Sequence, residues 1–277
     1  MSVGVIVVSY RTGGALHDGL PSWLNASGVT EIVAIDNGNE PSEAAALDAA
    51  ARSDRRLRIV RGQGNVGFAA ACNMGARHCE AAILVFVNPD VVLAEDAIVR
   101  LRAALEAAPP HAIVGGDLRD GGGAPERGSR RDRLTPWRAF VAVSGLSRFA
   151  GFAPVFRDFN RHGDPLPRHP VPVGAISGAL FAVAREDFEA LGGFDEGYFL
   201  HVEDIDLCRR AEMRGWPVLF APGPHGVHKR STSDVGSAFI RRHKMHSFAR
   251  YFEKFAGNPF EKALAGIAHG VVSVLWR

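Results

Sequence analysis

Short, nearly uninterrupted hydrophobic segments alternate with helix-like segments in the first part of the chain, and this alternation restricts the fold more than any other feature. The strand-like segments are Val3 to Val8, Glu31 to Asp36, Leu57 to Val60, Ala82 to Val87 and His111 to Leu118. The helix-like segments between them are residues 13–25, 42–52, 67–79 and 94–107. Strands without polar alternation are buried on both faces, which predicts an α/β fold with a mostly parallel sheet covered by helices. Ligands of such sheets bind beyond the carboxyl ends of the strands, so the loops after residues 8, 36, 60 and 87 are the expected site.

Residues 119–170 interrupt this alternation. They begin with Asp120-Gly-Gly-Gly-Ala-Pro125 and contain ten arginines against five acidic residues. Such a composition indicates a linker or a mobile flap. Beyond it, the pattern predicts order at Val173 to Ala184, a helix at 203–214, a short strand at Val218 to Ala221 and a helix at 234–254.

The C-terminal segment from Pro259 carries apolar residues at helical spacing. These residues are Phe260, Leu264, Ile267, Val271 and Leu275. The spacing predicts a helix that either packs on the domain or lies on a membrane surface or against a partner. We therefore expect one main domain at residues 1–232 and a helical extension at 233–277.

Composition limits the classes of protein to which the chain can belong. With 277 residues, 47% of them hydrophobic, the chain can bury one large core. A formal net charge of +2 is too small to indicate a nucleic-acid partner. Three cysteines, an odd number without metal-like spacing, argue against a disulfide framework and favour a reducing compartment. The N-terminus resembles a first strand rather than a signal peptide, and no apolar window is long enough to span a bilayer. We expect a cytoplasmic protein or one peripheral to the inner membrane face.

Asn88-Pro89-Asp90 follows the fourth strand-like segment directly. A carboxylate at this position can hold a divalent cation that bridges two phosphates, and hard oxygen ligands favour Mg²⁺ or Mn²⁺. The alternative is that Asp90 caps the helix that follows.

Glu203-Asp204 opens a helix-like segment and comes after the glycine- and aromatic-rich sequence GGFDEGYFLH. Acidic residues at a helix start stabilise the helix dipole, which is the simpler explanation. The glycines Gly192, Gly193 and Gly197 instead indicate a backbone shaped for close approach to a ligand. One carboxylate in such a pocket can act as general base on an acceptor hydroxyl.

His228 follows the short strand at 218–221, with Lys229 and Arg230 after it. The two cations are suited to phosphate oxygens, and Asp90 with His228 would form a two-residue metal site completed by diphosphate and water. His225 is an alternative histidine nearby, although a lone histidine is more often structural. The glycine-rich Gly62 to Gly67 segment has neither the spacing nor the position of a dinucleotide-binding loop, so we reject an NAD site.

Together these segments resemble the inverting glycosyltransferases of family 2, which have the GT-A fold, and within them the bacterial rhamnosyltransferase-like branch. Five blocks carry the resemblance: VIVVSYRTG near the start, EIVAIDNGN at 31–39, GNVGFAAACNMG at 64–75, ILVFVNPDVVL at 83–93, and the long block at 177–216. His228 adds a sixth point. The order and spacing of the blocks make the resemblance specific, and it spans about residues 3–232.

The resemblance implies a role for each matching residue. The implied donor-binding residues are Val8, Ser9 and Tyr10 at the base pocket, Asp36 on the base, Asn65, Gly67 and Asn73 at or behind the nucleotide, Asn88 and Asp90 at the diphosphate, and Gly178 near the sugar. Asp90 and His228 are the implied metal ligands. Asp204 is the implied general base, with Glu203 beside it as the second catalytic acid.

The chain departs from the family pattern at two places. His201-Val202 precedes Glu203 where branch members often carry Tyr, and Gly38 to Pro41 replaces a small polar run after Asn37. Both places bear on the identity of the sugar and the base rather than on the reaction class.

The resemblance implies a single displacement with inversion, in which a sugar leaves a nucleotide diphosphate for an acceptor hydroxyl. The Asn88-Pro89-Asp90 form favours dTDP-rhamnose, with UDP-hexose, UDP-galactofuranose and GDP-sugar donors as alternatives. The basic segment 119–170 and the cluster Arg241, Arg242 and Lys244 favour an anionic acceptor such as a polyprenyl-diphosphate-linked saccharide at the membrane. An inactive carbohydrate- or nucleotide-binding module, a nucleotidyltransferase and a homodimeric assembly stay open as alternatives.

Overall fold

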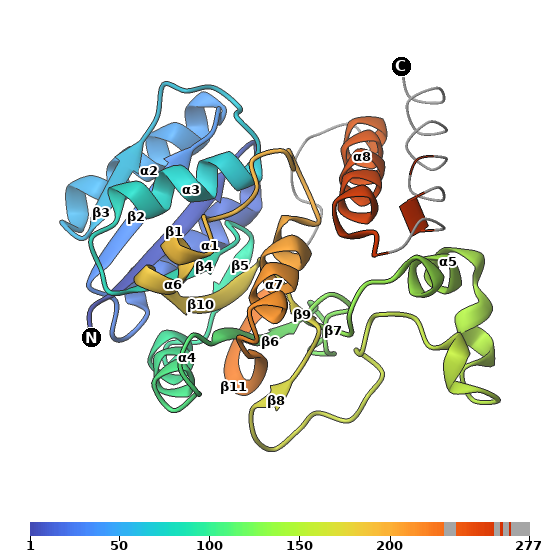
Figure 1. Ribbon diagram of the computed structural model, residues 1–277. Coiled ribbons are helices and arrows are strands. Elements are labelled where there is room, and N and C mark those ends of the chain that lie inside the picture. Colours follow the sequence, from blue (N-terminus) through green and yellow to red (C-terminus); the bar gives the residue numbers. More distant parts are fainter. Residues whose placement is uncertain (230–236, 258–260, 263–265, 267–277) are drawn as a thin grey trace.

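The structure is a computed structural model that describes residues 1–229, 237–257, 261–262 and 266 (Figure 1). The strands are β1 Val3–Ser9, β2 Glu31–Asp36, β3 Leu57–Val60, β4 Ile83–Val87, β5 Val91–Leu93, β6 Ile113–Arg119, β7 Arg130–Arg131, β8 Val171–Pro172, β9 Ala175–Ile176, β10 Leu180–Ala184 and β11 Val218–His228. The helices are α1 Gly14–Asn25, α2 Pro41–Ser53, α3 Phe68–His78, α4 Ala97–Glu106, α5 Pro136–Ser144, α6 Arg185–Ala190, α7 Glu203–Met213 and α8 Ser237–Phe255, with 3-10 turns η1 Leu146–Phe149 and η2 Pro154–Phe156.

One mixed sheet forms the centre of the molecule. Its strand order in the described residues is β3-β2-β1-β4-β10-β6-β11-β5, and β8 pairs with β11 beside this path. Strands β3, β2, β1 and β4 are parallel, β10 is antiparallel to both β4 and β6, and β11 is parallel to β6. The predicted mostly parallel α/β sheet is therefore confirmed.

Two hydrophobic cores explain the uninterrupted apolar strands. Within β1, Val5 and Val7 face one core while Ile6 and Val8 face the other, because successive side chains point to opposite sides of a sheet. Helices α1, α2 and α4 lie over the first core, and α3, α6 and α7 lie over the second. All three cysteines are buried and free, which agrees with the absence of a disulfide framework.

Strand β11 corrects the predicted short strand at 218–221. It continues to His228, and its pairing with β6 is irregular between Phe220 and His225. Gly223 has a φ of 111° within this irregularity. The Pro-Gly-Pro sequence has the composition of a turn, but β6 and β5 pair with the strand beyond it. His225 and His228 therefore lie in the strand, not in a loop after it.

The expected linker or flap at 119–170 contains ordered elements. β7 pairs with β9, and α5 begins after Thr135, whose Oγ1 accepts a 3.2 Å hydrogen bond from the Arg138 amide. Gly145 ends α5 in the left-handed conformation with a φ of 74°. Figure 1 shows α5 and the turns after it projecting from the side of the sheet.

Helix α8 packs against the main domain, with Ala249 and Tyr251 buried. The expected amphipathic tail from Pro259 lies largely outside the described residues. Among the described residues, no helix combines the length and apolar character needed to cross a bilayer.

Candidate active site

A cavity of about 170 Å³ opens at the carboxyl ends of β1 and β4, where the strand pattern predicted a site. Six of the predicted donor-binding residues line it: Val8, Tyr10, Asn65, Gly67, Asn88 and Asp90. The remaining wall comes from residues that sequence reasoning did not single out, among them Phe199, Leu200, Phe239 and Ile240. Helix α8 thus supplies part of the wall of a site built on β1 and β4.

Asn65 shapes the loop that borders this cavity. Its Oδ1 accepts hydrogen bonds from Asn37 Nδ2 at 3.0 Å and from the Gly67 amide at 3.1 Å. Gly67 has a φ of 86°, and a Cβ at this position would lie 2.8 Å from the Phe199 carbonyl oxygen. Only glycine therefore fits where the start of α3 meets the loop that carries Phe199.

Ser9 and Asp36 both form hydrogen bonds with the loop that follows β2, and neither lines the cavity. Ser9 Oγ donates to Asn39 Oδ1 at 3.1 Å. Asp36 Oδ1 accepts from the amides of Gly38 and Asn39 at 3.2 Å and 2.9 Å, and its Oδ2 lies 3.4 Å from Arg61 Nε. Their direct contact with a nucleotide base stays a prediction.

Asn73 lies behind the cavity and holds the glycine-rich loop. Its side chain accepts from the Phe194 amide at 2.9 Å and donates to Glu196 Oε1 at 2.9 Å. A Cβ on Gly193 would lie 2.6 Å from Asn73 Oδ1, and one on Gly197 would clash with Arg250. These two glycines allow close approach to protein side chains, which corrects the expectation that they approach a ligand.

Asp90 and His228 meet at the edge of the cavity although they are 138 residues apart. His228 Nε2 lies 3.1 Å from Asp90 Oδ1, and Nδ1 lies 2.8 Å from Glu126 Oε2. Burial acts against the charged imidazole, but hydrogen bonds to the two carboxylates outweigh it and raise the pKa of His228 to about 9. Strand β5 follows Asp90 and α4 begins only at Ala97, so Asp90 does not cap a helix.

Glu126 was not predicted, since it lies in the irregular Arg-rich segment. Metal-bound histidines commonly donate their second ring nitrogen to a carboxylate, as His228 is placed to do with Glu126. Asn88 Oδ1 is buried without a hydrogen-bond partner in the structure and borders the same cavity. An unpaired oxygen beside Asp90 fits a hard cation or a ligand donor. No cluster of three or more His, Cys, Asp or Glu side chains in the described chain has the arrangement of a complete metal site. Metal binding by Asp90 and His228 stays a prediction.

Asp204, the predicted base, lies at the start of α7 and does not line the cavity. Its Oδ2 accepts from the Gly178 amide at 2.8 Å and from Arg131 at 2.6 Å, and its Oδ1 accepts from the Ile205 amide at 2.7 Å. The Gly178 amide thus helps to fix the predicted base. A side chain at position 178 would crowd it, because a Cβ there would lie 3.2 Å from the Asp204 Cβ. Arg131 was not singled out, since ten arginines crowd residues 119–170.

Glu203 directly precedes Asp204 in α7, but its side chain has different surroundings. Its side chain is buried, and Oε2 has no hydrogen-bond partner in the structure. Burial, followed by repulsion from Asp204, raises the pKa of Glu203 to about 8. At neutral pH Glu203 is therefore mainly a neutral interior acid, whereas Asp204 is the member of the pair that contacts Arg131.

His201 and Val202 hold a strained turn directly before the pair. Their φ angles are 67° and 74°, which a β-branched residue such as Val202 rarely adopts. Burial, followed by the charge of Lys244, lowers the pKa of His201 to about 4. Partial burial, together with the charges of Arg127 and Arg131, lowers the pKa of Lys244. Arg131, which binds Asp204, is thus one of the cations that act on Lys244.

The structure describes the first of the two predicted phosphate-binding cations after His228. Lys229 Nζ donates to Asp18 Oδ2 at 2.6 Å, and the Lys229 amide donates to the Asp90 carbonyl at 3.0 Å. The backbone bond holds Lys229 next to Asp90, while its ammonium group points to α1. Arg230 lies outside the described residues.

The sequence model of the glycosyltransferase-like family 2 matches residues 2–254, which is most of the chain. The chain belongs to this family. The match includes nearly all of α8, which lines the cavity. The resemblance drawn from the five sequence blocks is confirmed.

Curated relatives of the chain include two rhamnosyltransferases. The chain is 27% identical over 256 residues to an N-acetylglucosaminyl-diphospho-decaprenol L-rhamnosyltransferase of Mycobacterium tuberculosis, covering 87% of this chain and 81% of the relative. It is 40% identical over 70 residues to the rhamnosyltransferase WbbL of Escherichia coli, covering 25% of this chain and 26% of the relative. The expected reaction class, a glycosyltransferase, is confirmed.

Solved structures share the fold. The mannosyltransferase PcManGT of Pyrobaculum calidifontis, solved with GDP-Man and Mn²⁺, is similar with a TM-score of 0.62 and 18% identity, covering 98% of this chain and 75% of that chain. The predicted GT-A fold is confirmed by such neighbours.

Proposed function

We propose that this glycosyltransferase transfers L-rhamnose from dTDP-rhamnose, with inversion, to a saccharide carried on a polyprenyl diphosphate. The observation that carries the proposal is the meeting of Asp90 and His228 at 3.1 Å beside the cavity. The two residues are far apart in sequence, but the pairing of β11 with β5 brings them together at the place where a diphosphate would leave. The relative of M. tuberculosis, named as an L-rhamnosyltransferase on a diphospho-decaprenol acceptor, supports the choice of donor sugar and acceptor.

Asp90 and His228 would hold Mg²⁺ or Mn²⁺ together with the donor diphosphate. The bound ion neutralises charge on the departing diphosphate. Glu126 keeps the His228 ring oriented toward Asp90, and Asn88 Oδ1 is available to a donor hydroxyl or to the hydration shell of the ion. The neighbour solved with Mn²⁺ supports a divalent cation.

Asp204 would remove the proton from the acceptor hydroxyl as that oxygen attacks the anomeric carbon. The Gly178 amide and Arg131 fix the carboxylate before the acceptor binds, which lowers the entropy lost in the reaction. As the proton reaches Asp204, its ion pair with Arg131 weakens, and the guanidinium is freed to face an anionic acceptor.

The cations near Asp204 support a diphosphate-linked acceptor rather than a neutral sugar. The charges of Arg127 and Arg131 both lower the pKa of Lys244, and Arg131 binds Asp204. An acceptor diphosphate would relieve the repulsion among them. With such an acceptor, we propose that the enzyme works at the cytoplasmic face of a membrane.

The test combines binding and turnover. Thermal unfolding in the presence of Mn²⁺ with dTDP, UDP or GDP should show the largest stabilisation with dTDP. Incubation with dTDP-rhamnose and a diphosphate-linked acceptor should release dTDP and give a product of inverted anomeric configuration by NMR. Preferential stabilisation by UDP or GDP, with turnover of the matching sugar, would replace the donor and leave the reaction class intact.

A further inference from the structure

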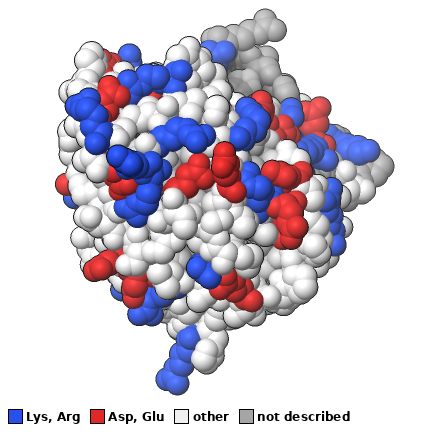
Figure 2. Space-filling model, turned by 90° about the vertical axis from the view of Figure 1, so that its left-hand side faces the viewer, with Lys and Arg blue, Asp and Glu red and all other residues white. Residues whose placement is uncertain are grey.

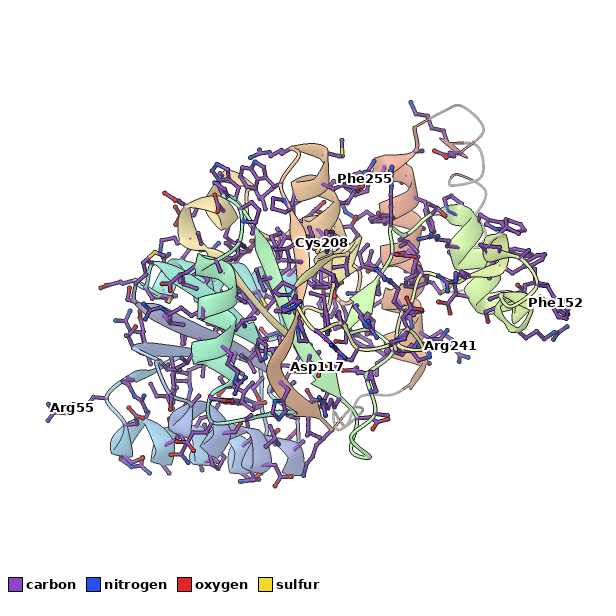
Figure 3. All side chains as sticks on the ribbon, turned by 90° about the horizontal axis from the view of Figure 1, so that it is seen from below. Arg55, Asp117, Phe152, Cys208, Arg241 and Phe255 are labelled. Atoms are coloured by element: carbon purple, nitrogen blue, oxygen red, sulfur yellow. The ribbon has the colours of Figure 1, made fainter. Side chains whose placement is uncertain are left out.

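An exposed aromatic surface projects from the side of the molecule next to the acceptor region. Its residues, named here the aromatic ridge, are Trp137, Phe140, Phe149, Phe152 and Val155. Phe152 is 88% exposed and Phe140 is 51% exposed. Figure 1 shows α5 and the turns after it far from the sheet, and Figure 3 shows Phe152 at the outermost tip, pointing away from the body.

Contacts within the aromatic ridge hold its side chains together. Trp137 Nε1 donates a 2.7 Å hydrogen bond to the Val155 carbonyl, which ties η2 to α5. The Trp137 and Phe140 rings lie 5.7 Å apart, and the Phe149 and Phe152 rings lie 6.4 Å apart. The exposed rings therefore form one surface rather than scattered side chains.

The same segment is anchored to the core from its other side. Val141 of α5 is buried at 0% exposure, and Leu134 just before the helix is buried at 4%. The Thr135 cap fixes the start of the helix. The aromatic ridge is consequently a supported part of the fold, and its rings stay exposed beside the part of the chain that the structure describes.

The charged residues within this segment are all basic, although Arg133, Arg138 and Arg157 pair with carboxylates outside it. Residues 133–157 contain four arginines, Arg133, Arg138, Arg148 and Arg157, and no acidic residue. The Arg148 guanidinium lies over the Phe149 ring at 4.7 Å and has no carboxylate partner among the described residues. The face on the left of Figure 1 differs, since basic and acidic side chains lie side by side there (Figure 2).

The aromatic ridge follows closely in the chain on a residue that binds the predicted base. Thr135, which caps α5, follows Arg131 by four residues, and Arg131 binds Asp204 at 2.6 Å. Arg131 thus connects the chain segment of the aromatic ridge to Asp204.

We propose that the aromatic ridge docks onto an anionic lipid bilayer, with Phe149 and Phe152 inserted at the headgroup level and Arg148 facing lipid phosphates. Trp, Phe and Arg are the residues that favour the membrane interface, and burial of rings adds to attraction by anionic lipids. A protruding ring such as Phe152 matches a fluid bilayer better than a protein surface, which would need a preformed pocket. The purpose of the docking, delivery of a lipid-linked acceptor to Asp204, rests on the proposed function.

The test is flotation of the full chain with vesicles that contain no acceptor. Vesicles of phosphatidylcholine with phosphatidylglycerol should carry the protein, and pure phosphatidylcholine should carry much less, with binding that weakens as salt rises. The double variant F149S/F152S should lower the partition coefficient about tenfold or more, because each ring loses its apolar burial. Val99→Ser is the matched control, because Val99 is an exposed apolar residue of α4 and should leave flotation unchanged.

Three outcomes would overturn the docking proposal. One is F149S/F152S floating like the natural protein. A second is V271D/L275D in the tail abolishing flotation while F149S/F152S keeps it. The third is that the natural protein sediments as a dimer, F149S/F152S sediments as a monomer, and neither protein floats with vesicles. The aromatic ridge would then be a contact between two copies of the chain.

Turnover separates this proposal from the proposed function. F149S/F152S should keep its rate on a short-chain, water-soluble acceptor and lose most of its rate on an acceptor embedded in vesicles. If no acceptor is used at all while flotation behaves as expected, the proposed function fails and membrane docking stands.

Discussion

Arg131 donates a 2.6 Å hydrogen bond to Asp204, and both side chains are only 11% exposed. Asp204 opens α7, whereas Arg131 comes from the segment that lacked a strand–helix pattern. The pair therefore joins the predicted base to the part of the chain that we assign to acceptor entry.

Loss of Arg131 should slow the transfer without weakening donor binding. We expect Arg131→Met to lower kcat about 100-fold, because Asp204 loses one of the groups that fix it. Arg133→Met is the matched control, since Arg133 is half exposed and its ion pair with Glu212 is 4.0 Å long. Steady-state kinetics with dTDP affinity measured in parallel decides, and equal rates for the two variants would contradict the role of Arg131.

Asp204→Asn should abolish most of the turnover while keeping the donor site. An amide cannot accept the acceptor proton, so we expect kcat to fall about 1,000-fold or more. Asp132→Asn, in the neighbouring segment, serves as control because Asp132 pairs only with surface arginines in the structure. Nucleotide binding should be equal in both variants, and near-natural turnover of Asp204→Asn would mean that another group is the base.

Glu126→Gln should weaken metal binding although Glu126 is not a proposed ligand. The carboxylate orients His228, and loss of such a partner lowers metal affinity about 10- to 100-fold. Mn²⁺ titration followed by electron paramagnetic resonance, with dTDP present, measures the change. Glu95→Gln, at an exposed acid of the same part of the fold, should bind Mn²⁺ normally. Unchanged affinity in Glu126→Gln would remove Glu126 from the metal site.

Glu203 should make stability depend on pH. Its pKa of about 8 lies above the usual value of 4.5, so the folded state retains a proton that the unfolded state has lost. This contribution to the free energy of unfolding is complete below about pH 4.5 and is lost as pH rises toward 8, with a limiting slope of about 1.4 kcal/mol per pH unit.

Urea unfolding at pH 5, 6, 7 and 8 tests the contribution of Glu203. Glu203→Gln is nearly isosteric and should remove this slope. The difference in the free energy of unfolding between the natural protein and the variant should therefore change steadily with pH. A constant difference would show that Glu203 is ionised in the folded protein.

Gly67→Ala should destabilise the donor loop more than Gly64→Ala does. Both glycines have positive φ, but only at Gly67 would a Cβ meet the Phe199 backbone, at 2.8 Å. We expect a loss of about 1–3 kcal/mol for Gly67→Ala, with weaker nucleotide binding. Thermal unfolding and dTDP titration of the two variants measure the difference. Equal effects would mean that the Phe199 backbone moves enough to accommodate the added Cβ.

Local sequence patterns determined the main strands, several helices and the cavity edge. The runs at 3–8, 31–36 and 82–87 are almost wholly buried, so burial alone determines that they form the interior of a sheet, whereas the run at 57–60 forms the edge strand β3 with Arg58 exposed. Asn88 and Asp90 were found because they end such a strand. The strand at 218–221 was predicted too short because Pro222, Gly223 and Pro224 have turn propensity, which pairing with β6 and β5 overrides.

Only the tertiary structure decided which polar groups meet. Arg131 and Glu126 come from a segment without a distinctive local pattern, and Phe239 comes from a predicted helix whose position relative to the sheet was not predicted. Their partners Asp204, His228 and the cavity residues of β1 and β4 lie far away in sequence. The sequence by itself determined the family and the layer architecture, since both depend on local apolar periodicity and motif spacing. The positions of the ion pairs and of the aromatic ridge depend on long-range packing. No local residue pattern identifies which distant side chain each of these residues will contact.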